Sequence, residues 1–549
     1  MKSVFNKIFA LGLVVLTSSV MTGCMDEIEP TSSTVTQAQV QASPSAADAL
    51  LMAMPAYLNH FDESTVDDGW HYAYGYPSQM MIRNMLGGDE GFNKSNYASH
   101  YFYWGINKYQ GSDYVFAGYI WRYYYGFLLA INNMVAGVDP AIANEDQLGA
   151  LGAGYAYRAL VYLDLARMYE FLPNDIFPDG LNADGNNVTG LTVPIVTDKT
   201  AEAEATNNPR ATHADMAAFI LDDLNKAEEY IVNLEDTRGN VIPDLACVYG
   251  LKARLYMWNE DYPNAEKYAR LAIDNASVAP LTQDKGLSLT NGMNTAADFM
   301  WAGETTSEDD AVQSGIVNWI SWATNQCYFA YTGGQTGLYT ICDAKMYNRI
   351  SNTDWRKLWF QAPEGSPLRA KIPYLSKSDA DELPPYASIK FRPAQGNTSD
   401  YKIATSCAYP VMRVEEMYLI EAEAAAHQSA ASGLEKIKSY MTSYRNPAYA
   451  TRAASQEDVI DEIVFQKQVE LWGEGQRFFD VKRLNLPVTR GYEDTPFYSQ
   501  FRLNTTTRPA WTNIVITRNE VMNNSALDKF NNPDPSDSYK IWTAEEGEK

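Results

Sequence analysis

The stretch ACVYGLKARLYMWNEDYPNAEKYARLAIDN, residues 246–275, decides the fold class. In its first half, small and apolar side chains recur at intervals of three and four residues, which places them on one face of a helix. They are Ala246, Tyr249, Gly250, Ala253 and Met257. The polar residues 259–261 then predict a turn, and Pro263 fits the first turn of a second helix that runs to Asn275. We therefore expect two helices that pack against each other.

The same stretch has the spacing of a tetratricopeptide unit, in which small residues on one helix admit bulky ones from its partner. The matching positions are Tyr249, Ala253, Tyr256, Ala265 and Ala272. Weaker helical patterns occur at residues 155–171, 214–234, 412–426, 434–444 and 459–484. Because unequal insertions separate them, they do not form a uniform solenoid. We predict a mainly α fold: about four tetratricopeptide-like helix pairs that carry long irregular insertions.

Three insertions, residues 60–112, 173–210 and 277–400, are rich in glycine, polar and aromatic residues. Loops longer than about 15 residues are usually functional or disordered. Their content of tryptophan and tyrosine argues for order. We therefore expect function to reside in these insertions.

Charge and aromatic content narrow the classes of ligand. The 549 residues include 68 acidic and 43 basic side chains, for a net charge of −25. Such a surface repels phosphate backbones, so we do not expect nucleic-acid binding. The chain also has 37 tyrosines, 12 tryptophans and 20 phenylalanines. These rings form either a large aromatic core or a surface that stacks on flat or sugar-like ligands.

The N-terminus has the pattern of an exported lipoprotein. Two lysines precede an apolar stretch, residues 8–20, that is too short to span about 30 Å of hydrocarbon. Residues 20–24, Val-Met-Thr-Gly-Cys, resemble a bacterial lipobox, so we expect cleavage of a signal peptide (1–23) and a lipid anchor on Cys24. The acidic residues 25–29 resemble the tag that sends lipoproteins of Bacteroidota to the outer cell surface, although acidic residues are common throughout this chain.

We divide the rest of the chain into three parts. Residues 24–45 are rich in threonine, serine and glutamine and are expected to form a flexible tether. Residues 46–276 would form an N-terminal region of helix pairs. Residues 277–549 would contain the ligand-face insertion and the last helix pairs.

Motifs for catalysis and for metal binding are missing from the sequence. The five histidines form no H-E-x-x-H, and neither G-x-S-x-G, a P-loop, G-x-G-x-x-G nor C-x-x-C occurs. Residues 182–185 resemble part of a calcium loop, but Gly180 and Leu191 occupy its first and twelfth positions. We expect no metal and no cofactor. A carboxylate pair for glycoside hydrolysis is defined by a distance of about 5 to 10 Å in space, so a surface glycoside hydrolase remains an alternative.

The C-terminal third resembles the SusD/RagB family. Residues 409–413 (YPVMR), 416–424 (EMYLIEAEA) and 469–483 (VELWGEGQRFFDVKR) match segments of that family in order and spacing. Further similarities occur at Trp121, Tyr124, Asn132, Asn133, Arg158, Ala159, Tyr162 and residues 354–357. Departures occur at residues 467–468, where Lys-Gln replaces the usual Glu-Arg, and at residues 149–154, which lack a usual glutamate.

The resemblance implies a lipoprotein of the outer membrane that faces the cell exterior and is attached to the membrane only through its lipid. Proteins of this family bind oligosaccharides, or in some branches peptides, and cover a TonB-dependent (SusC-like) transporter. They are not enzymes. The charged motif residues are then expected to form buried pairs that set helix register rather than to catalyse a reaction. They are Arg413, Glu423, Glu474, Arg477 and Asp480.

Two aromatic clusters are candidates for the ligand face, because sugar rings need flat apolar surfaces and amide or carboxylate partners. The first cluster comprises residues 70–76 (WHYAYGY), Tyr101, Tyr103 and Trp104, and its candidate ligand residues are Trp70, Tyr72, Tyr74 and Trp104. The second cluster comprises Trp319, Trp322, Asn325, Gln326, Tyr328, Tyr331 and Gln335, and its candidates are Trp319, Trp322, Asn325, Tyr328 and Tyr331. We expect Trp319 or Trp322 to stack on sugar, and packing in the core is the alternative for every ring. Trp301 is predicted to lie in a buried strand and Trp121 in the core of a helix. A peptide-binding or fimbria-like protein on the same scaffold remains a further alternative.

Overall fold

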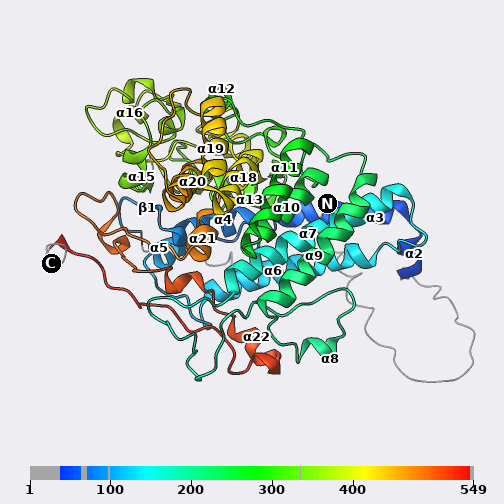
Figure 1. Ribbon diagram of the computed structural model, residues 1–549. Helices are drawn as coiled ribbons and strands as arrows, with labels where there is room; N and C mark the ends of the chain where they lie inside the picture. Colours follow the sequence, from blue (N-terminus) through cyan, green and yellow to red (C-terminus); the bar gives the residue numbers. More distant parts are fainter. Residues whose placement is uncertain (1–36, 63–70, 97–98, 334–335, 545–549) are drawn as a thin grey trace, which may run out of the picture.

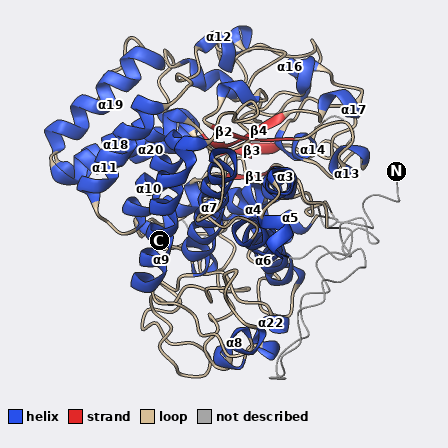
Figure 2. Cartoon of the chain, turned by 90° about the vertical axis from the view of Figure 1, so that its right-hand side faces the viewer, coloured by secondary structure: helices blue, strands red, loops and turns tan. Residues whose placement is uncertain are grey.

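A computed structural model describes residues 37–62, 71–96, 99–333 and 336–544. Within these ranges the chain is mainly helical, which confirms the predicted fold class. The long helices lie side by side in one curved layer, while the short strands and the loop-rich insertions lie beside it (Figures 1 and 2).

Nine helices in the described ranges have fourteen or more residues. They are α3 (Pro44–Leu58), α6 (Val115–Ala136), α7 (Glu145–Tyr169), α9 (His213–Tyr230), α10 (Leu245–Trp258), α11 (Tyr262–Asn275), α18 (Val414–Gln428), α19 (Ala430–Tyr444) and α20 (Gln456–Glu470). Each contacts its neighbour in the order α6, α7, α9, α10, α11 and α18, after which α18 contacts both α19 and α20. This packing agrees with the expected tetratricopeptide-like pairing.

Shorter helices occur mostly in the connections. They are α2 (Gln37–Gln41), α4 (Tyr76–Gly87), α5 (His100–Gly105), α8 (Glu202–Ala205), α12 (Gln283–Gly286), α13 (Asp310–Gln313), α14 (Trp319–Ala323), α15 (Ala344–Arg349), α16 (Asp379–Glu382), α17 (Tyr401–Ala404), α21 (Arg477–Arg483) and α22 (Arg518–Asn523). None of the helices in the described ranges is long and apolar enough to cross a membrane.

The helix pair α10–α11 has the geometry that its sequence predicts. Asp244 and Asp261 cap the two helices, each accepting a hydrogen bond from a backbone N–H three residues later. The only residues that α11 buries are three alanines, at positions 265, 269 and 272. A Cβ on Gly250 would lie 2.3 Å from the sulfur of Met412. Small residues therefore allow both helices to approach their neighbours closely.

Two predicted helix boundaries are wrong. Helix α7 begins at Glu145, ten residues before the expected start, and includes Gly149 and Gly152. A Cβ at either glycine would lie within 2.7 Å of backbone atoms of residues 231 or 234, so the glycines permit a close contact inside the helix. The stretch predicted as one region, 459–484, is divided between α20 and α21. Gly473 and Gly475 adopt positive φ angles of 78° and 73°, which end α20 and set the turn.

Two small antiparallel sheets connect distant parts of the chain. Strand β1 (Glu90–Phe92) pairs with β3 (Thr340–Cys342). Strand β2 (Trp301–Glu304) pairs with β4 (Ala408–Met412), with an irregularity at its first pair. Trp301 is fully buried at the start of β2, as predicted.

One hydrophobic core extends across the proposed boundary at residues 276 and 277. Tyr157 of α7, for example, meets Trp301 edge to face with ring centroids 4.8 Å apart. Trp121 is buried in helix α6, as predicted, and Cys247 is buried in helix α10. A second, smaller cluster joins α18, α19 and α20. The boundary itself stays a prediction.

Candidate functional site

The two aromatic clusters predicted from sequence meet in space. The ring of Tyr101 lies 4.8 Å from that of Trp322, and His71 lies 4.1 Å from Tyr331. Pairing of β1 with β3 holds the two segments together. Residues about 250 positions apart therefore form one aromatic assembly.

Most of this assembly is core rather than ligand face. Trp319 and Trp322 lie on the helix α14, but their exposed fractions are only 4% and 0%. Trp319 packs edge to face against Phe391, and Trp322 packs against Tyr101 and Tyr331. The expectation that one of these tryptophans offers a free stacking face is therefore corrected: neighbouring rings already cover both.

The described ligand candidates of the first aromatic cluster are also buried. The exposed fractions of Tyr72, Tyr74 and Trp104 are 2% or less. Tyr72 contacts Trp104 edge to face, and the hydroxyl of Tyr74 accepts a hydrogen bond from Tyr101. These three side chains are corrected to core residues. Trp70 lies outside the described residues.

Asn325 links loops instead of facing a ligand. Its amide nitrogen donates to the carbonyls of Thr340 and Ser388 at 2.8 Å each, and its oxygen accepts from the Thr340 N–H at 3.0 Å. All three bonds are made with backbone atoms and the side chain is buried. The expected contact of Asn325 with a sugar hydroxyl is corrected to a structural role.

Two predicted ligand residues keep access to solvent. Tyr328 is 49% exposed, and Tyr331 is half-buried with its hydroxyl donating to Asn96 at 3.1 Å. Beside Tyr331, burial lowers the pKa of His71 to about 4, so its ring is neutral at pH 7. The binding role of Tyr328 and Tyr331 stays a prediction.

A more exposed row of tyrosines begins at α5. Tyr103, Tyr109 and Tyr114 follow one another with ring centroids 5.2 Å apart at both steps. Tyr109 and Tyr114 are 45% and 43% exposed. Tyr109 adopts a φ angle of +58°, which is uncommon for a residue with a Cβ and occurs more often at functional positions. We call these three residues the tyrosine row; only Tyr103 belonged to a cluster that the sequence indicated.

A groove of about 370 Å³ begins at the end of this row. Tyr114 lines it together with three exposed aspartates, Asp113, Asp184 and Asp534. The stretch that resembles part of a calcium loop lies along its wall, where the amide nitrogen of Asn182 donates to the backbone carbonyls of residues 529 and 531. That amide fixes a loop. The groove thus places carboxylate acceptors next to an aromatic surface.

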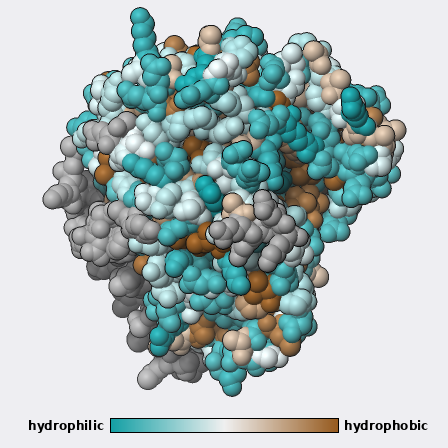
Figure 3. All heavy atoms as spheres, turned by 90° about the vertical axis from the view of Figure 1, so that its left-hand side faces the viewer, coloured by the Kyte–Doolittle hydropathy of each residue, from teal (hydrophilic) through white to brown (hydrophobic). Residues whose placement is uncertain are grey.

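On one face of the molecule, the apolar surface that is visible is dispersed. The face of the molecule in Figure 3 is mainly hydrophilic, and its hydrophobic patches are small and separate. A broad apolar docking surface is therefore not a feature of that face.

Four of the five charged motif residues form buried pairs, as predicted. Arg413 Nη1 lies 2.8 Å from Glu474 Oε1, and Lys390 Nζ lies 2.6 Å from the same oxygen. Glu423 accepts from Lys467 at 2.9 Å, and Lys467 also reaches Asp480 at 2.9 Å. These contacts join α18, α20 and α21 through charge-assisted hydrogen bonds.

Arg477 departs from this pattern. Its Nε and Nη1 atoms are buried and have no hydrogen-bond partner within the described part of the chain. The predicted pairing of Arg477 is therefore wrong for these two atoms. The other four motif residues have structural partners.

Comparison with known proteins supports one assignment. Residues 376–544 match the model of the SusD family. The SusD-like protein P2 of Formosa agariphila is 22% identical over 406 residues, which are 68% of this chain and 73% of that protein. Similar structures include a SusD-like carbohydrate binding protein from Bacteroides vulgatus, with a TM-score of 0.66, 18% identity and coverage of 89% of this chain and 98% of that one.

A SusD superfamily protein from Bacteroides thetaiotaomicron gives a TM-score of 0.64 at 16% identity, covering 88% of this chain and 98% of that one. At these identities the structures show a shared fold. The family model adds the match over the segment that contains the paired charges of α18, α20 and α21. Residues 376–544 are thus similar to the SusD family, and the chain shares the fold of SusD-like proteins.

Proposed function

We propose that this protein is a cell-surface lipoprotein that binds oligosaccharide and delivers it to a TonB-dependent (SusC-like) transporter. The match of residues 376–544 to the SusD family supports the binding role, and the Bacteroides vulgatus structure described as carbohydrate binding shares the fold. The observation that carries the proposal is the tyrosine row beside a groove that contains carboxylates.

The tyrosine row suits the apolar faces of sugar rings. Two of its three rings are more than two-fifths exposed, so each offers a face that no other side chain covers completely. Aromatic rings bury large areas at little entropic cost, and their truncation at a binding site typically costs about 2 kcal/mol, roughly thirtyfold in affinity. The row therefore provides the stacking surface that the buried tryptophans do not.

The groove suits the hydroxyl groups of the same ligand. Asp113, Asp184 and Asp534 supply acceptors, since an ionised carboxylate accepts hydrogen bonds and donates none. Asp113 pairs with Arg518 at 3.1 Å, whereas Asp184 and Asp534 form no ion pair in the described residues. These two charges repel an anionic polymer, and the chain as a whole is negative. We infer that the oligosaccharide bound here is neutral.

The membrane connection rests on Cys24. It lies outside the described residues, and the described helices offer no membrane span. Acylation of Cys24 would place the protein on the outer face of the outer membrane, where a transporter partner could receive the ligand. We propose binding without catalysis.

Isothermal titration calorimetry tests the binding site. Neutral gluco-, xylo- and manno-oligosaccharides would be compared with oligogalacturonides of equal length. We expect a neutral ligand to bind, and Tyr109→Ala and Tyr114→Ala each to lose roughly thirtyfold in affinity. Tyr268→Ala, on a partly exposed tyrosine of the scaffold helix α11, is the matched control and should bind normally.

Two other results would contradict the proposed location of the site or the proposed function. Loss of oligosaccharide binding in Tyr328→Ala, with Tyr109→Ala unaffected, would place the site at the second aromatic cluster. Binding of peptides but of none of the oligosaccharides would favour the peptide-binding alternative, and release of reducing sugar would favour a hydrolase.

A further inference from the structure

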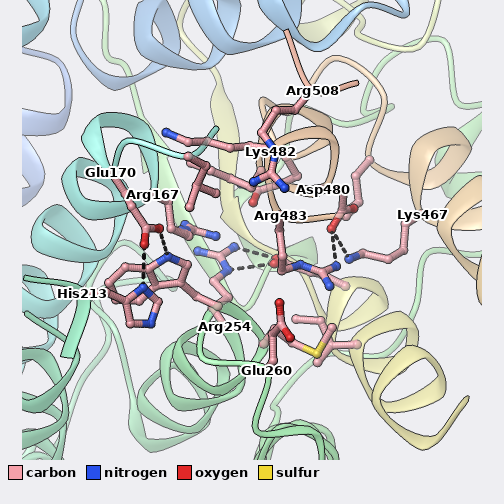
Figure 4. A pocket seen from close by; sticks show the side chains of 18 residues that line it. Arg167, Glu170, His213, Arg254, Glu260, Lys467, Asp480, Lys482, Arg483 and Arg508 are labelled. Atoms are coloured by element: carbon pink, nitrogen blue, oxygen red, sulfur yellow. Dashed lines mark hydrogen bonds and ion pairs between the residues drawn. The ribbon is translucent and has the colours of Figure 1, made fainter. Parts of the chain in front are cut away.

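A second site of different character lies inside the helical layer. A cavity of about 230 Å³ opens between α7, α10, α20 and α21 (Figure 4). Six cationic side chains line it, against four carboxylates, in a chain whose net charge is −25. The six are Arg167, Arg254, Lys467, Lys482, Arg483 and Arg508.

Three of the four carboxylates already have partners. Glu416 receives two hydrogen bonds from Arg254, at 2.8 and 2.6 Å. Asp480 accepts from Lys467 and from Arg483 at 2.9 Å each. Glu170 accepts from the ring of His213 at 2.7 Å and from an indole N–H at 2.8 Å. The fourth, Glu260, is exposed at the edge of the cavity.

Among the cations, in contrast, two guanidinium nitrogens have no acceptor, and two side chains have no carboxylate partner. Arg254 Nη1 and Arg483 Nη1 are buried without a hydrogen-bond partner in the described residues, on side chains that are 2% and 10% exposed. Lys482 Nζ donates to the carbonyl of Met168 at 2.9 Å, and Arg508 Nε donates to the amide oxygen of Asn485 at 2.8 Å. Neither of these two cations forms an ion pair with a carboxylate in the described part of the chain. A buried donor that is left unsatisfied destabilises the fold, and an acceptor supplied by a ligand would remove that penalty.

The pKa values of two cations that line the cavity are also lowered. Burial lowers the pKa of Lys482 well below its usual range; Glu170 partly opposes this shift, and Arg508 reinforces it. The pKa of Arg508 is lowered as well, again chiefly by burial. A negative charge in the cavity would raise both pKa values by favouring the charged forms.

We propose that this cavity binds a small molecule that bears a carboxylate, phosphate or sulfate group. Oxygen atoms of such a group accept charge-assisted hydrogen bonds from guanidinium and ammonium donors, and guanidinium nitrogens are well placed for planar, bidentate contacts. Met257, Ile420 and Phe479 line other parts of the cavity and would contact the apolar portion of the ligand. Entry is from the side where Glu260 is exposed and Arg508 and His213 are half-buried.

Calorimetry and thermal melting of the whole mature protein test this proposal. The probes are inorganic phosphate, inorganic sulfate, and glucuronate with glucose as its neutral counterpart, all at one ionic strength because free salt screens charge. We expect at least one of the three anions to bind and to raise the melting temperature, and glucose to do neither at this site. Binding by glucuronate alone would identify a carboxylate ligand, whereas binding by phosphate or sulfate would identify a tetrahedral oxyanion.

Two variants locate the binding. Lys482→Met removes a deep cation of similar length, and Arg508→Gln removes a half-buried one at the entrance. Each should weaken anion binding at least tenfold. Arg452→Gln makes the same change as Arg508→Gln at an exposed position outside the cavity lining and should leave affinity unchanged. If Lys482→Met fails to fold, Arg508→Gln still decides the result.

The proposal is overturned if none of the anions binds at about 10 mM, which corresponds to an affinity weaker than millimolar. It is also overturned if Arg508→Gln and Arg452→Gln bind alike. Tyr109→Ala should leave anion binding intact, and Arg508→Gln should leave neutral oligosaccharide binding intact. Failure of the cavity and failure of the glycan site can therefore be told apart.

Discussion

Arg413 donates a hydrogen bond to Glu470 over 2.7 Å, across 57 residues of sequence and with both side chains at most 1% exposed. Arg445 and Arg356 reach the same carboxylate at 2.7 and 3.0 Å. These cations hold the pKa of Glu470 well below its usual range against the opposing effect of burial. Glu470 therefore joins the end of α20 to the start of α18 and to two loops.

Removing this charge should destabilise the whole C-terminal region. Glu470→Gln leaves three buried arginines without their shared counterion, and breaking a buried pair typically costs about 3–5 kcal/mol. Chemical denaturation should show this loss in the free energy of unfolding. Glu435→Gln, the same change at an exposed site of α19, should have little effect. Equal stability of the two variants would contradict a structural role for Glu470.

The small-residue face of α10 makes a second prediction. Ala253 is fully buried, so Ala253→Leu should overpack the interface and cost roughly 1–3 kcal/mol. Ala431→Leu places the same side chain on an exposed position of α19 and is the control. Thermal melting distinguishes the two, and an unchanged melting temperature in Ala253→Leu would show that this face tolerates bulk.

Trp322→Ala provides the third prediction. Its ring is fully buried among Tyr101, Tyr331 and Phe92. Truncation should therefore leave a cavity that costs about 3–5 kcal/mol, measured as a loss of unfolding free energy. Tyr328→Ala, at a ring that is half exposed, should cost far less. A wild-type melt for Trp322→Ala, combined with lost oligosaccharide binding, would restore the original assignment of this residue.

These residues show which features a sequence can predict. The helix pair of residues 246–275 was predicted because its alanines repeat at helical intervals, and the buried charges because their motif is similar to that of a family. The orientation of the tryptophans could not be predicted in this way. Trp322 and Tyr328 lie six residues apart in equally irregular sequence, yet one is buried and the other exposed. That difference depends on segments near residues 71 and 101, which approach only in the folded chain.

The cavity among the helices leaves no pattern in the sequence, for a related reason. Arg167, Arg254 and Lys482 belong to three separate helices, and each is an ordinary helical cation in sequence. The sequence indicates the tyrosine row only weakly. Three tyrosines occur within residues 103–114, but the positive φ of Tyr109 occurs at a position that holds neither glycine nor asparagine, so the sequence does not indicate it.

Cys24→Ala tests the proposed anchor. If Cys24 carries the lipid, the variant should leave the detergent-requiring membrane fraction and be recovered in the aqueous fraction, because acyl chains supply the membrane affinity. Expression without a transporter partner removes indirect retention, and Cys247→Ala controls for the loss of a thiol that is buried in the core. Retention of Cys24→Ala in the membrane would contradict the anchor.

The pair of His213 and Glu170 should make stability depend on pH. Hydrogen bonding to Glu170 and Asn259, with the nearby charge of Glu260, raises the pKa of His213 above its ordinary 6.5 despite burial. His213 therefore stabilises the fold fully below about pH 6.5, and this contribution disappears as pH rises through the raised pKa. Burial opposes ionisation of Glu170, but the hydrogen bond from His213 lowers its pKa below the ordinary 4.5. That contribution is present above about pH 4.5 and is lost as pH falls through the lowered pKa.

Both contributions coincide between about pH 4.5 and 6.5. His213→Gln keeps a polar side chain but cannot become charged, so its deficit in unfolding free energy should be largest in this window and should shrink toward alkaline pH. Denaturant titrations at closely spaced pH values would measure it. Glu170→Gln should reduce the deficit caused by His213→Gln, because the charged partner is then already absent. A deficit that is constant from pH 5 to pH 9 would mean that His213 acts only through its contact with Trp258, whose tilted ring lies 4.0 Å away.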